Sequence, residues 1–423
     1  MITIAYCHNK TSRLLTVARK VSKLSIIVTL TALYSCEVSN EASSISSNTP
    51  ENVRYKAKLV LNDSIDLPFI IEYTSGSSLV LHNSTEKIEM IPESNADSIN
   101  FQFPVFNSAL KFIEHDNGEL SGFFHDYDKG PEFSLRFIAV PSNEPRFTTS
   151  TTPCCSLNYP WEVIMRYDSD KPRHALGEFF QNESIVTGSI ITQSGDYRYL
   201  EGVLDGDQMS LATFDGKFAY VFRARLQNNE FLGHYFAGNS EAIPWKAIRN
   251  DDFRLPSSSS LTFIKSEYDK FSFNFPDKNG NLRGVIEGKV NLVQILGSWC
   301  PNCMDEARVL EKWFQRYQDK GLVVTGLAFE YTADEEKGWQ AIEKMKRDLQ
   351  LSYPILFAGQ ATPQATQEAL PMLNKVMAYP TIIVIDRKGN VRQIKTGFKG
   401  PGTSYFTAYK KDMESLINEL LHE

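Results

Sequence analysis

A continuous apolar run leads directly into two closely spaced cysteines in this chain of 423 residues, in the segment VNLVQILGSWCPNC. Such a run, without polar alternation, is typical of a central strand that is covered on both faces. After Cys303 the apolar residues follow a helical spacing, so Cys300 and Cys303 lie where a buried strand passes into a helix. Three kinds of site fit this pair at first: a structural disulfide, half of a metal site, or a redox couple.

The segments around this pair alternate between strand and helix. LVVTGLAF, YPILFAG and PTIIVID have the composition of buried strands, and stretches with helical spacing separate or follow them. One of these helices is expected to begin where Thr362 precedes Pro363, because proline is favoured at the first position of a helix. This alternation predicts an α/β fold for residues 261–423, with a sheet covered on both sides.

The preceding region, 53–253, has an almost purely β pattern. Short runs rich in aromatic and β-branched residues, such as YKAKLVL and FAYVFRARL, alternate with turn signals such as Asn117-Gly118 and Asp205-Gly206. Glycine recurs between apolar residues, as in LEGVL and FLGHY, and often marks a bulge or a bend inside a strand. We predict an all-β meander that closes into a barrel or a sandwich. Its histidines lack the spacing of metal ligands, so a structural, adaptor or ligand-binding role is expected rather than catalysis.

The N-terminus has the organisation of a secretory signal. Five basic residues precede Leu24, and the short apolar segment LSIIVTLTALYSC follows them. This segment is shorter than the ~20 apolar residues of a membrane-spanning helix. Its ending resembles a bacterial lipoprotein box, which implies that residues 1–35 are removed and that acylated Cys36 anchors the protein to a membrane. The alternative is an ordinary cleaved signal in which Cys36 is incidental. We expect a protein on the periplasmic side of the bacterial cell envelope.

Two segments poor in apolar residues divide the rest of the chain. Residues 36–52 are rich in Ser, Asn and Glu and read as a flexible tether, and RLPSSSS, residues 254–260, reads as a linker. The formal net charge of −7 and the lack of a long basic run give no reason to expect a nucleic-acid partner. The adjacent cysteines Cys154 and Cys155 stand in a polar connector. They fit a vicinal disulfide, an acceptor of electrons from Cys300, or plain exposed loop residues.

The strand-to-helix junction favours redox chemistry at the first cysteine pair. A helix N-terminus carries unpaired N–H groups and about half a positive charge, which stabilise a thiolate. Cys300 is then the attacking thiolate, and Cys303 resolves the mixed disulfide. A zinc site or a cysteine protease lacks partners, because the only histidine after His234 is His422. A structural disulfide that closes so short a loop contributes little stability. We expect neither a metal nor a cofactor beyond the cysteine pair.

Together with AYPTIIVID further along, VNLVQILGSWCPNC resembles the thioredoxin superfamily. The signal sequence and the long separation of these motifs are similar to the extracytoplasmic TlpA/ResA branch, whose members include proteins with a β-rich N-terminal extension. The resemblance covers about residues 262–422 and implies a thioredoxin fold. It also implies a nucleophile and a resolving thiol, a tryptophan that shields them, and a cis-proline loop that faces the bound partner. The catalytic residues are then Cys300 and Cys303, and the substrate-binding residues Trp299, Pro301, Tyr379 and Pro380.

The resemblance further assigns a role to Glu306, which follows Cys303 by three residues. The TlpA/ResA branch places a carboxylate here, and a half-buried one with a raised pKa would relay the proton of the resolving thiol. The alternative is a glutamate on the helix surface. Gln294 stands where cytoplasmic thioredoxins have a buried aspartate, which strengthens the case for Glu306. Arg308 replaces a proline that usually kinks the helix in this branch, so the helix geometry here stays open.

These features predict an envelope-anchored thiol–disulfide oxidoreductase that reduces disulfides of exported proteins. A membrane electron donor is expected to recharge it, because the sequence has no fingerprint for a nicotinamide or flavin cofactor. One alternative is a thiol peroxidase, although Gly297 stands where those enzymes typically have a threonine. Another is a β domain that binds a ligand or partner and carries an accessory redox domain.

Overall fold

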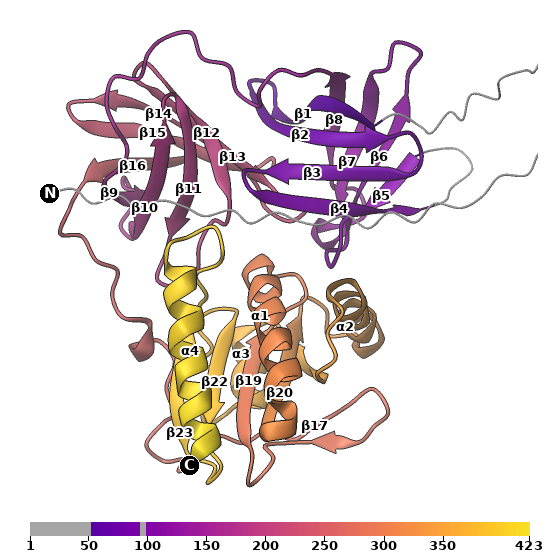
Figure 1. The fold of residues 1–423 in the computed structure, drawn as a ribbon, viewed down its shortest axis with the longest axis vertical. Helices are drawn as coiled ribbons and strands as arrows, with labels where there is room; N and C mark the ends of the chain where they lie inside the picture. The colour runs from indigo at the N-terminus through magenta and orange to yellow at the C-terminus, as the bar shows by residue number, and fades with distance from the viewer. Residues whose placement is uncertain (1–51, 94–98) are drawn as a thin grey trace, which may run out of the picture. The chain divides into compact units, whose positions relative to one another are not determined.

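The computed structural model describes residues 52–93 and 99–423. The predicted signal sequence 1–35, the lipidation candidate Cys36 and all but the last residue of the predicted tether lie outside the described residues. In sequence order, the described part holds two all-β regions and then an α/β region (Figure 1). All described residues belong to one compact unit.

The first all-β region is a closed barrel of eight antiparallel strands (Figure 1). It closes because β1 pairs with both β2 and β8. Buried and less buried residues alternate along β1, so Tyr55, Ala57 and Leu59 point into the barrel, as the two-residue period of a strand requires. The strands are β1 (Asn52–Asn62), β2 (Ile65–Thr74), β3 (Ser78–Asn83), β4 (Glu86–Glu93), β5 (Ile99–Gln102), β6 (Ser108–Glu114), β7 (Leu120–Asp126) and β8 (Ser134–Pro141), with a 3₁₀ turn, η1, at Tyr127–Lys129.

The second all-β region is another closed eight-stranded barrel, in which β9 pairs with β10 and with β16. Glycine allows close packing of neighbouring strands here: a Cβ on Gly202 would lie 1.8 Å from the carbonyl oxygen of Ser210, and one on Gly233 would lie 1.9 Å from that of Arg223. The strands are β9 (Pro160–Met165), β10 (Arg173–Asn182), β11 (Ile185–Ile191), β12 (Leu200–Asp205), β13 (Gln208–Phe214), β14 (Ala219–Gln227), β15 (Glu230–Ala237) and β16 (Ile243–Arg249).

The prediction of an all-β region is therefore confirmed, and its strands close into barrels. The structure contains two barrels, which the sequence pattern did not separate. Aromatic side chains are buried in both barrels, among them Phe69 and Phe137 in the first and Trp161 and Trp245 in the second. Phe214 of the second barrel packs on Phe69 of the first at 5.0 Å between ring centroids.

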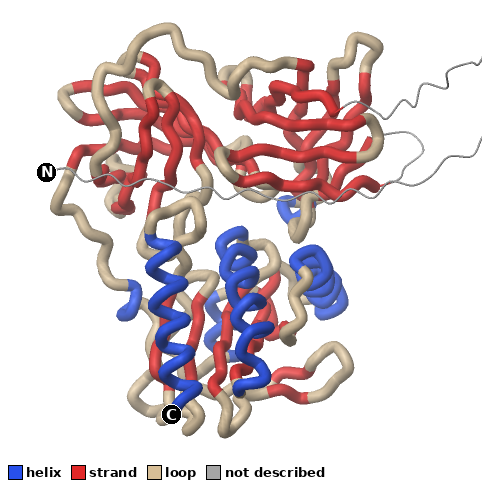
Figure 2. Tube along the Cα trace, in the orientation of Figure 1, coloured by secondary structure: helices blue, strands red, loops and turns tan. Residues whose placement is uncertain are grey.

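The α/β region has a five-stranded sheet in the order β21-β20-β19-β22-β23. The central strand β19 is parallel to β20 and antiparallel to β22. Figure 2 shows the α-helices of the described residues gathered in this part of the chain. The elements are β17 (Phe275–Pro276), β18 (Leu282–Arg283), β19 (Val290–Leu296), α1 (Pro301–Tyr317), β20 (Leu322–Glu330), α2 (Glu335–Leu349), β21 (Ile355–Gln360), α3 (Pro363–Ala369), β22 (Thr381–Ile385), β23 (Val391–Thr396) and α4 (Tyr405–His422), with 3₁₀ turns η2 (Ser258–Ser260) and η3 (Gln318–Lys320).

Strand β19 is buried along its whole length, and its side chains enter two separate cores. Leu292 and Leu296 pack with residues of α1, α2 and α4. Val293 and Ile295 belong to a cluster on the other face of the sheet, which includes Leu370 at the end of α3. Layers on both faces confirm the predicted α/β fold.

Helix α1 runs without interruption past Arg308, whose helical geometry the sequence left open. The side chain of Arg308 is exposed, and its guanidinium donates to Asp305 at 3.1 Å. Across residues 52–93 and 99–423, every helix is too short or too polar to cross a lipid bilayer.

Candidate active site

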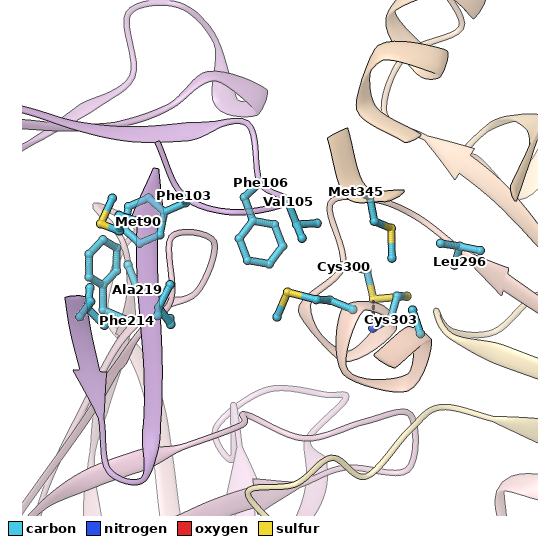
Figure 3. Packing of buried hydrophobic residues seen from close by; sticks show 14 of the residues in the cluster. Met90, Phe103, Val105, Phe106, Phe214, Ala219, Leu296, Cys300, Cys303 and Met345 are labelled. Carbon is cyan, nitrogen blue, oxygen red and sulfur yellow. Dashed lines mark hydrogen bonds between the residues drawn. A yellow bond between two sulfur atoms is a disulfide. The ribbon is translucent and has the colours of Figure 1, made fainter. Parts of the chain in front are cut away.

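The two cysteines of WCPNC lie at the junction between β19 and α1. They form a disulfide with a Cα–Cα distance of 5.2 Å. Cys300 is the N-cap of α1, and its sulfur accepts a hydrogen bond from the backbone N–H of Cys303 at 3.2 Å. Cys300 is 5% exposed whereas Cys303 is fully buried, so Cys300 carries the outer sulfur. Figure 3 shows the pair within the buried cluster that also holds Leu296 and Met345.

This position sets the electrostatics of the outer sulfur. Pro301 occupies the first turn of α1, where free N–H groups and the positive end of the helix dipole face the cap residue. When the disulfide is reduced, the same N–H of Cys303 is available to a Cys300 thiolate. Both effects favour the ionised sulfur and therefore make Cys300 the better nucleophile of the two.

Aromatic side chains and a proline loop surround Cys300. The Trp299 ring stacks on Tyr331 at 4.3 Å between centroids and meets Tyr379 edge-on at 5.3 Å. The peptide bond between Tyr379 and Pro380 is cis, as predicted, and the Tyr379 carbonyl oxygen lies 3.5 Å from the Cys300 sulfur. Three of the four expected substrate-binding residues, Trp299, Pro301 and Tyr379, line a cavity of about 570 Å³ together with Cys300.

Glu306 lies one helical turn beyond Cys303 and is fully buried rather than half-buried. Tyr409 donates a hydrogen bond to its carboxylate at 2.7 Å, and the Gln294 amide donates another at 2.9 Å. The same amide lies 3.4 Å from the carbonyl oxygen of Cys303, which links the carboxylate to the inner cysteine. Burial raises the pKa of Glu306 to about 7, although both hydrogen bonds act in the opposite direction. A solvated surface glutamate is therefore ruled out.

The Glu306 carboxyl also has a connection to a second cavity. Tyr409, its hydrogen-bond donor, lines a cavity of about 920 Å³ between β23, α4 and the segment before β17, together with Lys395. The Lys395 ammonium lies 5.2 Å from the centre of the Tyr409 ring. Cys300 does not line this cavity, so the connection between the cavity and the cysteine pair passes through Tyr409 and Glu306.

We expect Glu306→Gln to remove a pH-dependent step. Glu306 accepts a proton only as a carboxylate, so resolution of a mixed disulfide by Cys303 should accelerate as pH rises through about 7 in the wild type. In the glutamine variant this limb should disappear, with resolution at pH 8 slowed about 10- to 100-fold. The measurement is the single-turnover decay of a mixed disulfide between pH 5 and 9.

Unfolding of the same variant serves as the control. A buried carboxyl with a raised pKa contributes stability at low pH that is lost as pH rises through its folded pKa. Glutamine cannot ionise, so Glu306→Gln should lose less stability than the wild type between pH 5 and 8. A pH limb near 7 that survives in the variant would assign the proton transfer to another group.

A second buried carboxylate, Glu330, supports the segment before the cysteines. Glu330 is the last residue of β20. Its carboxylate accepts hydrogen bonds from the backbone N–H of Ser298 at 3.0 Å and from the Ser298 hydroxyl at 2.7 Å. Burial raises the pKa of Glu330 to about 7, and the bonds from Ser298 oppose this shift. The motifs around the cysteine pair gave no prediction for this residue. The available signal was an acid at the carboxyl end of the apolar run LVVTGLAF, beside the strand that carries the cysteines.

Arg198 is a further residue that sequence reasoning missed. It lies between β11 and β12 of the second barrel, is 1% exposed, and donates two hydrogen bonds to Asp305 of α1, at 2.9 and 3.1 Å. It also donates to Asp215 at 2.6 Å and to Glu86 of the first barrel. One guanidinium thus joins three carboxylates, and it fixes both barrels to the turn of α1 that follows Cys303.

Cys154 and Cys155 lie in the connection between the barrels and form no disulfide; the Cys154 thiol donates a hydrogen bond to the Cys155 sulfur at 3.7 Å. Burial, followed by the interaction with Cys154, raises the pKa of Cys155 to about 11. A thiol with so high a pKa is a poor nucleophile at neutral pH. Neither cysteine is among the described residues that line the cavity at Cys300.

Residues 271–411 match the Redoxin family model. Over 132 residues the chain is 28% identical to "Thioredoxin-like protein YneN" of Bacillus subtilis (strain 168), a match that covers 31% of this chain and 65% of that relative. The chain therefore spans less than two thirds of the length of this curated relative.

Two solved structures are also similar to this chain. A putative thiol:disulfide interchange protein DsbE from Chlorobium tepidum is 23% identical, covering 36% of this chain and 96% of its own, with a TM-score of 0.29. The thioredoxin domain of a thiol-disulfide oxidoreductase from Bacteroides vulgatus is 20% identical, covering 37% of this chain and 100% of its own, with a TM-score of 0.29. At these TM-scores, nothing further rests on the two likenesses.

Proposed function

We propose that this protein is a thiol–disulfide oxidoreductase of the thioredoxin superfamily that reduces disulfides of exported proteins. The match of residues 271–411 to the Redoxin family model and the likeness to a thioredoxin-like protein support this proposal. The observation that carries the proposal is the disulfide between Cys300 and Cys303 at the N-terminus of α1. Its outer sulfur opens onto a cavity of about 570 Å³, where a substrate sulfur can reach it. The inner sulfur is buried and is placed to resolve the intermediate.

The reaction proceeds in two exchanges. The Cys300 thiolate attacks one sulfur of the substrate disulfide, which forms a mixed disulfide and releases a substrate thiolate that takes up a proton. Cys303 then passes its proton to Glu306, and its thiolate attacks the Cys300 sulfur. The second substrate thiol leaves, the Cys300–Cys303 disulfide forms again, and two electrons have moved to the substrate.

The position in the cell envelope is part of the same proposal. It is supported by the basic N-terminus, by the apolar segment ending at Cys36 and by the tether-like composition of residues 36–52. Several acyl chains on Cys36 would hold the protein at a membrane, and a dithiol donor there would reduce the cysteine pair after each turnover.

The proposal is tested by trapping the first intermediate. In the reduced Cys303→Ser variant the second exchange is blocked, so a disulfide-bonded protein mixed with it should remain attached to Cys300. We expect nearly stoichiometric mixed disulfide on non-reducing gels, released by dithiothreitol, whereas the wild type should release its product within one turnover. The Cys154→Ser/Cys155→Ser variant is the matched control and should behave like the wild type.

The same preparation separates a reductase from a peroxidase. If the Cys303→Ser variant accumulates no mixed disulfide, while the wild type consumes hydrogen peroxide at the expense of its thiols, the reductase assignment is wrong.

A further inference from the structure

The cavity above Cys300 has walls from two parts of the chain. Trp299, Tyr331 and Tyr379 form the wall on the α/β side. The opposite wall comes from the second barrel, where Tyr197 and Tyr220 line the same cavity. A substrate disulfide that reaches the outer sulfur therefore also contacts the barrel.

The barrel wall is fixed to the active-site helix. The carboxylate of Asp196 accepts a hydrogen bond from the backbone N–H of Gly400 at 2.5 Å, and Arg198 is bonded to Asp305 of α1. A Cβ added to Gly195 would lie only 2.8 Å from the side-chain nitrogen of Asn302, the residue before Cys303. Because this wall is anchored, the cavity of about 570 Å³ admits a small or extended group more easily than a folded surface.

The charges of the cavity point to an anionic group beside the substrate disulfide. Of its three cationic residues, Lys217 is paired with Asp128 at 2.7 Å and with Asp126 at 3.2 Å, and Lys129 lies 3.8 Å from Asp126. The third, Arg173 at the start of β10, is exposed, and its guanidinium makes no hydrogen bond or ion pair with any residue of 52–93 or 99–423.

Asp196, which also lines the cavity, does not compensate the positive charge of Arg173. Among the described lining residues, Asp196 is the one carboxylate, and it is buried. It is already bonded to the backbone N–H groups of Gly400 and Arg198. A guanidinium without a partner, placed at a cavity of this size, is suited to bind a carboxylate in the two-pronged geometry that arginine favours.

We propose that the second barrel forms the recognition wall of the active site, and that Arg173 determines specificity by binding a carboxylate close to the disulfide of a flexible substrate. This inference rests on the proposed function, since the disulfide is reduced by the two exchanges described above. The carboxylate can belong to a small thiol compound or to an acidic residue of an extended peptide, and both present the same chemistry to Arg173.

The test compares substrates of different charge in single turnovers of pre-reduced protein. With Arg173→Ala, the rate with glutathione disulfide should fall about five- to tenfold, while the rate with uncharged hydroxyethyl disulfide should change less than about twofold. Arg173→Lys keeps the charge but not the two-pronged geometry, so its rate with glutathione disulfide should lie between those of the wild type and Arg173→Ala. Arg225→Ala is the matched control, because Arg225 pairs with exposed Asp207 and does not line the cavity.

A pair of peptide disulfides, with Asp or Asn beside the cysteine, identifies the source of the carboxylate. Loss of rate only with the Asp peptide places the carboxylate on a polypeptide, and loss only with glutathione disulfide places it on a small thiol. An equal effect of Arg173→Ala on charged and uncharged substrates would overturn this inference and leave the proposed function intact. A wild type that reduces none of these disulfides would overturn both.

Discussion

Replacing Arg198 by methionine is expected to lower the free energy of unfolding by about 3–5 kcal/mol. Methionine occupies a similar volume, so the main loss is electrostatic. The substitution removes the cation that Asp305, Asp215 and Glu86 share, and all three are buried or nearly so. Asp305 keeps its pair with Arg308, but Asp215 and Glu86 lose the cation that compensates them. Carboxylates left unpaired in such a site must either stay charged without compensation or take up protons, and both cost stability. Urea unfolding at neutral pH measures the change.

The control for this prediction is an arginine in an exposed pair. Arg225 of the second barrel pairs with Asp207 at 3.4 Å, and both side chains are exposed. Arg225→Met should therefore change stability by less than about 1 kcal/mol. If the Arg198→Met variant were as stable as the Arg225→Met variant, the buried network would contribute little to the free energy of unfolding.

A double-mutant cycle isolates the contact between the barrel and α1. Arg198→Met and Asp305→Asn remove the two partners of one bidentate interaction, so their effects should fall short of additivity by about 1–3 kcal/mol. Strict additivity would show that the two residues act independently. Because Asp305 belongs to the active-site helix, the cycle also tests whether the β region is more than an accessory to the redox region.

Substituting Cys300 by serine is expected to abolish disulfide reduction, with a loss of at least about a hundredfold, down to the uncatalysed exchange. Serine keeps the size and the N-cap role of the residue, since its hydroxyl can still accept from the N–H of Cys303. The loss therefore reports the missing sulfur rather than a disturbed helix. Cys303 cannot replace it, because it is fully buried in the cluster of Figure 3.

Two measurements accompany this variant. Reduction of a protein disulfide is followed with dithiothreitol as the electron source, and circular dichroism checks that the fold is retained. Activity that persists in Cys300→Ser would end the assignment of the nucleophile. If the Cys154→Ser/Cys155→Ser control lost activity instead, the electrons would pass through the pair in the connection between the barrels.

The sequence carried most of the information about the α/β region, because its signals are local. The unbroken apolar run of β19 is buried over its whole length, as a central strand should be. Thr362 caps α3, and Pro363 is its first residue. The turn at Asn279-Gly280 connects β17 with β18. Each of these features depends on residues within a few positions of one another.

What the sequence did not show depends on contacts between distant segments. Arg198 and Asp305 are separated by 107 positions, and Arg198 and Glu86 by 112, so local composition gives no reason to pair them. The closure of the β strands into two barrels likewise depends on the pairing of the first strand with the last strand of each barrel. The alternation of buried and exposed residues along one strand does not determine this pairing. The full burial of Glu306 depends on Tyr409 of α4, which lies 103 positions away.

The cluster around Arg198 has a consequence for how such a chain can be rebuilt. A catalytic segment grafted onto these barrels from another protein would need an acid at the position of Asp305, because Arg198 is buried and donates to that carboxylate. A neutral residue there would leave the buried guanidinium with fewer partners and would weaken the contact between the barrel and the helix. An exchange of the catalytic segment therefore has to retain this one acid.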